Sequence, residues 1–118
     1  MNLGLLENYL KLTTSRQQAV SQNMANVDTP GYRTRDVDFE HEMHRAMVQA
    51  SFGGASAELT PAVQEVKGLM ERADGNNVSL DRESLLLSET QLQYQLGTQL
   101  VKHEFHNLLS AINGGGQG

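Results

Sequence analysis

The sequence predicts a mainly α-helical protein whose long N- and C-terminal helices pack as a coiled-coil-like pair, with a small irregular segment between them. Three observations support this fold class. The chain has 118 residues, which is the size of one domain. Apolar residues recur at steps of three and four near both ends, which is the period of one helix face. The region between the two patterns has no comparable periodicity.

The N-terminal helix is expected over residues 2–27. Its stripe alternates steps of three and four, like a heptad repeat with two polar positions in its middle. The helix should stop at Asp28-Thr29-Pro30-Gly31, because the residue before a proline avoids the helical region and Pro-Gly suits the centre of a type II turn. The stripe consists of Leu3, Leu6, Leu10, Thr13, Gln17, Val20, Met24 and Val27.

The C-terminal helix is expected over residues 80–112 and carries two rows, so it can contact more than one neighbour. Ser79 is the predicted N-cap, and Asp81 and Glu83 suit the first turn. Asn113-Gly114 is the predicted stop. One row is Leu80, Ser84, Leu87, Gln91, Tyr94, Thr98, Val101, Phe105, Leu108 and Ile112, and the other is Leu85, Leu92, Leu96 and Leu100.

The domain organisation follows from these two patterns. We expect residues 1–31 and 74–113 to form the helical core, residues 32–73 a variable middle segment and residues 114–118 a flexible tail. Within the middle segment, the sequence predicts a short helix over 39–50 and a small-residue loop over 51–56, and it leaves open whether 60–73 forms a helix or an irregular strand. Asp74-Gly75-Asn76-Asn77 is a strong turn signal.

Composition excludes several classes of function. The net charge is −5 and there is no basic stripe, which argues against nucleic-acid binding. The absence of cysteine excludes disulfides and Cys-ligated zinc. The longest apolar runs are three residues, whereas a membrane span needs about 20. No basic stretch followed by an apolar one opens the chain, so we expect no cleavable signal peptide.

Two histidine pairs are the best candidates for metal binding or catalysis, but the pattern has little specificity. His41 with His44, and His103 with His106, each share a helix face at a spacing that suits metal ligands. The zinc-protease pattern fails because Arg45 stands where its second histidine belongs. We therefore expect no enzyme, metal or cofactor.

Asp36 and Asp38 are paired acids in an extended segment, so their side chains should face opposite sides. The prediction for them is solvation, or pairing with Arg33 and Arg35, and not catalysis.

The polar faces of both long helices are almost free of charge. Arg16 is the only charged residue over 13–27, and 90–101 contain none. Neutral amides and hydroxyls are cheaper to desolvate than charges. Two interpretations stay open: an antiparallel bundle whose Gln and Ser face water, or an assembly subunit whose helices are buried by neighbouring copies. The second predicts an interface of Leu3, Leu6, Leu10, Val20, Met24, Val27, Leu87, Leu92, Tyr94, Leu96, Val101, Phe105, Leu108 and Ile112.

The exit from the first helix carries a motif. Asn23 and Asn26 share one face, where their amides can bind the departing loop, and Tyr32 can fold back onto the helix. The segment resembles the signature Asn-x-Ala-Asn-x-x-Thr-x-Gly-Tyr of the bacterial flagellar rod, hook and rod-like axial proteins. Asp36-Val37-Asp38-Phe39 is similar to its proximal-rod members. Every fixed position of the signature matches, at Asn23, Ala25, Asn26, Thr29, Gly31 and Tyr32.

The resemblance implies a structural subunit that builds the proximal rod, the drive shaft of the flagellar basal body, by helical self- and hetero-assembly of its terminal helices. It implies type III export to the periplasmic rod with no signal peptide removed. The implied neighbours are the membrane-ring protein FliF, the adaptor FliE and the rod proteins FlgC and FlgF, or proteins like them. The alternative is a free-standing helical adaptor or chaperone that binds partner helices and is stably folded alone.

Overall fold

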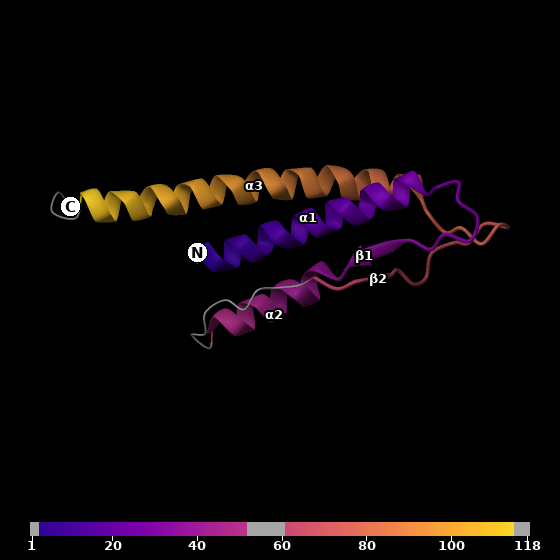
Figure 1. The fold of residues 1–118 in the computed structure, drawn as a ribbon, viewed down its shortest axis with the longest axis horizontal. Coiled ribbons are helices and arrows are strands. Elements are labelled where there is room, and N and C mark those ends of the chain that lie inside the picture. The colour runs from indigo at the N-terminus through magenta and orange to yellow at the C-terminus, as the bar shows by residue number, and fades with distance from the viewer. Residues whose placement is uncertain (1–2, 52–60, 115–118) are drawn as a thin grey trace.

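The computed structural model describes residues 3–51 and 61–114, and the order of elements is α1 (Leu3–Ala25), β1 (Arg35–Val37), α2 (Phe39–Ser51), β2 (Val63–Glu65) and α3 (Leu80–Asn113). The molecule is elongated, with extents of 68 × 27 × 16 Å. Its radius of gyration is 18.2 Å, whereas a compact chain of this length would have about 13–14 Å. The long axis follows α3 (Figure 1).

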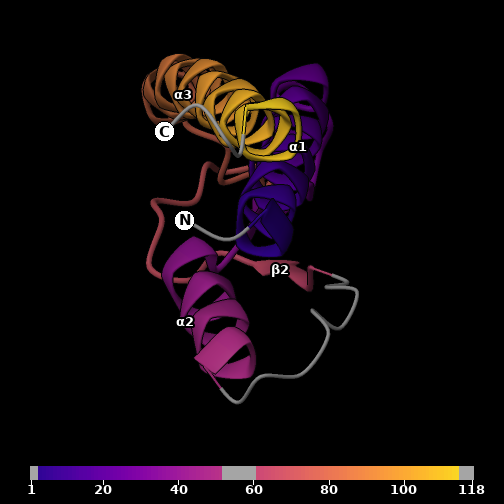
Figure 2. The same cartoon turned by 90° about the vertical axis from the view of Figure 1, so that its left-hand side faces the viewer.

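Helix α1 is the middle layer of the molecule. Helix α3 packs along one side of it, and α2 with the small sheet packs on the other (Figures 1 and 2). Burial on both sides explains why α1 supplies much of the core despite its modest apolar content. The fully or nearly fully buried hydrophobic side chains of α1 are Leu6, Leu12, Ala19 and Val20. The predicted pair of long terminal helices is therefore confirmed.

The two long helices run antiparallel and approach closely at Gly97. A Cβ atom added there would lie 2.7 Å from Leu10 Cδ2 and 3.1 Å from the Tyr9 ring. At the other end of the pair, Asn23 of α1 bonds Glu83 of α3. Counting outward from these contacts, Leu3 at the start of α1 lies level with about residue 103 of α3. Helix α3 therefore continues past α1.

The rows predicted on α3 do not mark the face that packs against α1. The buried positions of α3 are Glu83, Leu86, Thr90 and Gly97, and none of them belongs to either row. This face consists of a glycine, one leucine, one threonine and a carboxylate bonded to α1, so apolar periodicity cannot reveal it. The apolar rows lie on its flanks, and many of their residues are exposed.

The middle segment forms a short sheet and a helix. Strands β1 and β2 pair antiparallel, with Asp36 opposite Gln64. The helix predicted over 39–50 is confirmed as α2, and the segment 60–73 contains an irregular strand, not a helix. The loop predicted over 51–56 lies almost entirely outside the described residues, as does the tail beyond residue 114. The proposed domain boundaries stay a prediction.

Local signals set the helix ends. Ser79 caps α3 in extended geometry, with φ −105° and ψ 114°, and its side chain accepts a bond from Arg82 N. Gly31 has φ +75°, and Tyr32 N donates to Thr29 O, as a type II turn with Pro30 at its second position requires. Helix α1 ends two residues before the predicted position. Among the helices of the described segments, none has the apolar length that crossing a bilayer would need.

Candidate functional site

Two loops interlock at the end of the helix pair where α1 ends and α3 begins. We call them the loop latch, and they comprise residues 26–34 and 71–78 (Figure 1). Gly31 N donates to Asp74 O at 2.8 Å, and Asn77 N donates to Tyr32 O at 3.3 Å. A Cβ atom on Gly75 would lie 3.4 Å from Gly31 Cα, and both glycines have positive φ. Glycine at both positions lets the two backbones approach.

Two buried asparagines of the second loop hold the first. The Asn76 amide nitrogen donates to Asn26 O and to Thr29 O, each at 2.9 Å. These carbonyls follow the last residue of α1, so Asn76 holds the loop that leaves this helix from a distant part of the chain. Asn77 Oδ1 accepts from Thr34 N at 2.7 Å and from its hydroxyl at 2.8 Å. The predicted turn at 74–77 is thus the closing half of the latch.

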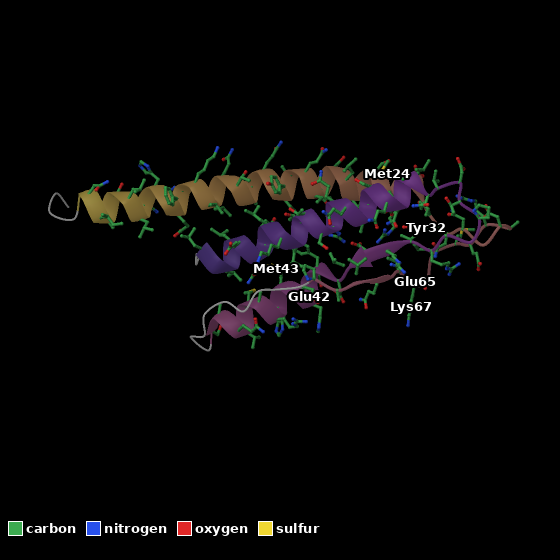
Figure 3. All side chains as sticks on the ribbon, in the orientation of Figure 1. Met24, Tyr32, Glu42, Met43, Glu65 and Lys67 are labelled. Atoms are coloured by element: carbon green, nitrogen blue, oxygen red, sulfur yellow. The ribbon has the colours of Figure 1, made fainter. Side chains whose placement is uncertain are left out.

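Asn23 shows what the sequence motif does in the fold. Its side chain is fully buried. Its Oδ1 accepts from Arg35 N at 3.0 Å and from the Tyr32 hydroxyl at 3.3 Å. Its Nδ2 donates to Arg35 O at 2.8 Å and to Glu83 Oε1 at 2.5 Å. The expected bonding to the departing loop and the folding back of Tyr32 are confirmed, and Figure 3 shows Tyr32 beside the end of α1.

The second asparagine of the motif acts more locally. Asn26 Nδ2 donates to Gln22 O at 2.8 Å, and its Oδ1 accepts from the Thr29 hydroxyl at 3.0 Å. The motif therefore shapes the helix exit through Asn26 and Thr29, and it joins that exit to β1 and α3 through Asn23. In this structure the motif makes contacts inside the chain.

A line of alternating charges connects the three layers beside the latch. Glu83 is fully buried, and Arg82 Nη1 donates to its Oε2 at 2.6 Å. Arg82 Nη2 also donates to Asp36 Oδ2 at 3.0 Å. Arg16 of α1 makes two bonds to the Asp36 carboxylate, each at 3.2 Å. Each buried carboxylate in this line has a cationic partner, which offsets its desolvation.

The expected environment of Asp36 was therefore wrong. The side chain is neither solvated nor paired with its sequence neighbours. The strand pleat turns Asp36 toward the helices, where Arg16 and Arg82 arrive from distant parts of the chain. Arg33 instead bonds Glu65 at 2.9 Å and lies 3.2 Å from Glu71, and its partner Glu65 raises the pKa of the guanidinium further.

The residues predicted for an assembly interface fall into three groups. Leu6 and Val20 lie in the core of the chain itself. Leu10, Met24, Val27, Leu87 and Val101 are half-buried at the edges of helix contacts. The remaining residues are exposed, and the two largest exposed fractions are 70% for Ile112 and 68% for Leu92. The exposed group is Leu3, Leu92, Tyr94, Leu96, Phe105, Leu108 and Ile112.

An apolar cavity of about 230 Å³ opens where α1, α2 and α3 come together. Sequence reasoning missed the contribution of α2, although Met43 and Met47 are four residues apart and share a helix face. Figure 3 shows Met43 between α2 and α1, whereas Lys67 points away from the body. Burial beside the cavity raises the pKa of the Tyr9 hydroxyl. The lining is Leu5, Leu6, Tyr9, Met43, Met47, Leu96 and Leu100.

The histidine pairs do not converge. Over residues 3–51 and 61–114, the fold gathers no three His, Cys, Asp or Glu side chains in a geometry that could hold a metal ion. His41 and His44 lie on α2, and His103 and His106 lie on α3, with α1 between the two helices.

Two comparisons with known proteins were informative to different degrees. No protein family model matches the chain. The chain is 32% identical over 122 residues to the flagellar basal body rod protein FlgB of Salmonella typhimurium, covering 90% of this chain and 88% of the relative. It is 30% identical to FlgB of Aeromonas hydrophila, over 94% and 92% of the two chains. Identity to FlgB of Borrelia hermsii is 29%, over 92% and 93%. The chain therefore belongs to the FlgB family of flagellar basal body rod proteins.

Proposed function

We propose that this chain is a structural subunit of the flagellar basal body that builds the proximal rod by helical self- and hetero-assembly of its terminal helices. Similarity to FlgB proteins supports the rod role. The structural observation that carries the proposal is the surface of α3. This helix exposes large apolar side chains on faces that α1 leaves uncovered, and it does so along its whole length.

The exposed row on one flank of α3 illustrates the argument. Leu85, Leu92 and Leu96 are 61%, 68% and 55% exposed. A soluble monomer rarely presents a continuous apolar strip of this kind without a partner. The residues between them are mostly neutral, and neutral polar groups can be buried against another helix at lower cost than charges. A neighbouring helix would bury the part of this strip from Leu92 to Leu96 without stranding a charge, because residues 90–101 carry none. Glu89, which is exposed, is the one charged residue between Leu85 and Leu92.

The parts of the chain would then have different places in the rod. Residues 1–31 and 74–113 would form the inner helical layer, and 32–73 would face outward. Neighbours like FlgC and FlgF would meet this layer along the rod, and proteins like FliE and FliF would meet it at the membrane ring. Export through the flagellar type III apparatus, without removal of a signal peptide, would deliver the subunit to the periplasm. The rod role is preferred to a free-standing adaptor because the relatives are rod proteins over nine-tenths of this chain.

A charge placed on the uncovered surface of α3 tests the proposal. Gln95 is exposed between Tyr94 and Leu96, so Gln95→Lys should leave the isolated fold intact. In the assembly the same lysine would be buried without a partner, which costs several kcal/mol. We expect loss of swimming, and loss of the subunit from purified basal bodies, in bacteria whose own rod subunit is replaced by this variant.

The matched control is Gln49→Lys on the exposed side of α2. It makes the same substitution on a segment that we propose to lie outside the inner layer, so swimming should be retained. Normal swimming with Gln95→Lys, at the expression level of the control, would contradict burial of α3 in the rod.

A further inference from the structure

Two methionines of α2 line the apolar cavity where the three helices come together. Met43 is half-buried and Met47 is 53% exposed. Both border the same space of about 230 Å³, together with leucines of α1 and α3 and the side chain of Tyr9. Figure 3 shows Met43 between α2 and α1. The thioethers are the groups in this lining that a mild oxidant converts into strongly polar ones.

The cavity gives an oxidant a route to these sulfur atoms. It is open to the outside, and its space admits molecules of the size of water. Hydrogen peroxide is only slightly larger than water, so it can reach both methionines from inside the cavity. Met24 of α1 is half-buried like Met43, but it does not line this cavity. Access through the cavity therefore distinguishes two methionines of similar burial.

The contact that these methionines make matters most for the later turns of α2. The start of the helix is held by Phe39, whose ring meets the Tyr9 ring edge to face at 5.7 Å and lies 5.8 Å from the Arg16 guanidinium carbon. The later turns depend on buried Ala46 and on the two methionines. A sulfoxide oxygen is costly to bury among apolar side chains. An oxidised side chain therefore leaves the cavity for water, and the later turns of α2 lose that contact.

We propose that Met43 and Met47 form an oxidation-sensitive contact, in which a peroxide converts their thioethers to sulfoxides and releases the C-terminal part of α2 from the cavity. The sulfur attacks one peroxide oxygen, the S–O bond forms as the O–O bond breaks, and the other oxygen leaves as water with both protons. Sulfur loses two electrons and the peroxide gains them. Methionine sulfoxide reductases reverse this oxidation, so the contact can be restored.

A time course of oxidation tests the route. The full chain is treated with hydrogen peroxide, and sulfoxide at each methionine is followed by peptide mass spectrometry, with each rate divided by the rate in the urea-unfolded chain. Met70, which is 94% exposed, should react first. Met47 should follow, and Met43 should react severalfold faster than Met24. Equal rates for Met43 and Met24, or no sulfoxide at Met43 and Met47 when Met70 is fully oxidised, overturns the proposal.

Amide hydrogen exchange tests the consequence. In the oxidised chain, exchange over residues 45–51 should become severalfold faster, while α1 and α3 beside Gly97 keep their protection. Treatment with methionine sulfoxide reductases should restore the original rates. Unchanged exchange over residues 45–51 with both sulfoxides present overturns the proposal.

Two variants assign the effect to the cavity. The double variant Met43→Leu, Met47→Leu nearly conserves side-chain volume and cannot form a sulfoxide there, so peroxide should leave residues 45–51 protected. Met70→Leu is the matched control, because it removes the most exposed methionine of the described segments outside the cavity, and it should respond like the natural chain. An equal rise in exchange in the double variant overturns the proposal. Neither experiment involves a flagellum, so failure here leaves the rod function to be judged by swimming.

Discussion

The two ends of the helix pair differ in chemistry: buried polar groups dominate one end, and exposed apolar side chains dominate the other. At the latch end, most buried polar groups have partners within the chain, as Asn23 and Asn76 do, and Asn77 Nδ2 is the exception among the latch side chains. At the other end, α3 runs past α1, and side chains such as Phe105 and Ile112 remain exposed. One end is held together by bonds within the chain, whereas at the other end α3 extends beyond the start of α1 (Figure 1).

Along a single pair of helices, the polar end specifies how the chain folds, and the apolar end offers surface for association. Polar networks specify one arrangement, because every member needs a partner at a defined place. Apolar helix surface is less demanding and accepts any helix of suitable shape. An assembling subunit benefits from both, since the latch fixes how far α3 is offset from α1, and that offset determines how much apolar surface is presented.

The largest loss of stability is expected when the centre of the polar network is removed. Asn23→Ala takes the amide donor from the buried Glu83 carboxylate and unpairs both backbone groups of Arg35. Glu83 keeps its bond to Arg82, but each buried donor or acceptor that loses its partner costs about 1–3 kcal/mol. Because several groups lose a partner at once, we expect the free energy of unfolding, measured by urea denaturation followed by circular dichroism, to fall by more than the cost of one such group.

Asn107→Ala is the control for this experiment, since it makes the same substitution at an exposed position near the end of α3. Its urea midpoint should stay close to that of the natural chain. If Asn23→Ala unfolded at the same midpoint as Asn107→Ala, the latch end could not be the stable part of the molecule.

The next largest effect is expected at the close approach of the two long helices. Gly97→Leu would place a bulky side chain where even a Cβ atom lies within 3.1 Å of the Tyr9 ring. Overpacking of this kind costs about 1–3 kcal/mol. The loss should appear in urea denaturation. Gln99→Leu introduces the same side chain on an exposed face of α3, and equal stability of the two variants would show that α1 and α3 do not meet at Gly97.

The two long helices were predictable because residues close to their ends in the sequence determine where they begin and end. Ser79 provides a cap two residues before Asp81, and Pro30-Gly31 prevents α1 from continuing. Each signal acts on residues close to it in the sequence. The predicted end of α1 and the predicted start of α3 therefore both lie within two residues of their positions in the structure. The asparagine motif was predictable for the same reason, since most of its partners follow within a dozen residues.

The inward face of α3 was not predictable from the same sequence. Glu83 reads as a favourable acid in the first turn of a helix, and its burial depends on Asn23, which is 60 residues away in the sequence. Asp36 likewise depends on Arg16 and Arg82, which arrive from separate helices. Apolar periodicity identifies which residues favour burial, and on α3 it identifies the two apolar rows. The face that packs against α1 is a third one, and polar contacts such as Asn23 with Glu83 determine it.

The smallest change in stability is expected at the exposed end of α3. Leu108→Ala removes a side chain of α3 that is about half exposed in the single chain, so the free energy of unfolding in dilute solution should change by less than about 0.5 kcal/mol. Leu6→Ala makes the same substitution at a fully buried position and should cost about 2–5 kcal/mol. Both values can be measured by urea denaturation at a concentration where the chain is monomeric. A cost for Leu108→Ala that approached the cost for Leu6→Ala would mean that this end of α3 is buried within one chain, and it would then be no part of the exposed apolar surface proposed for assembly.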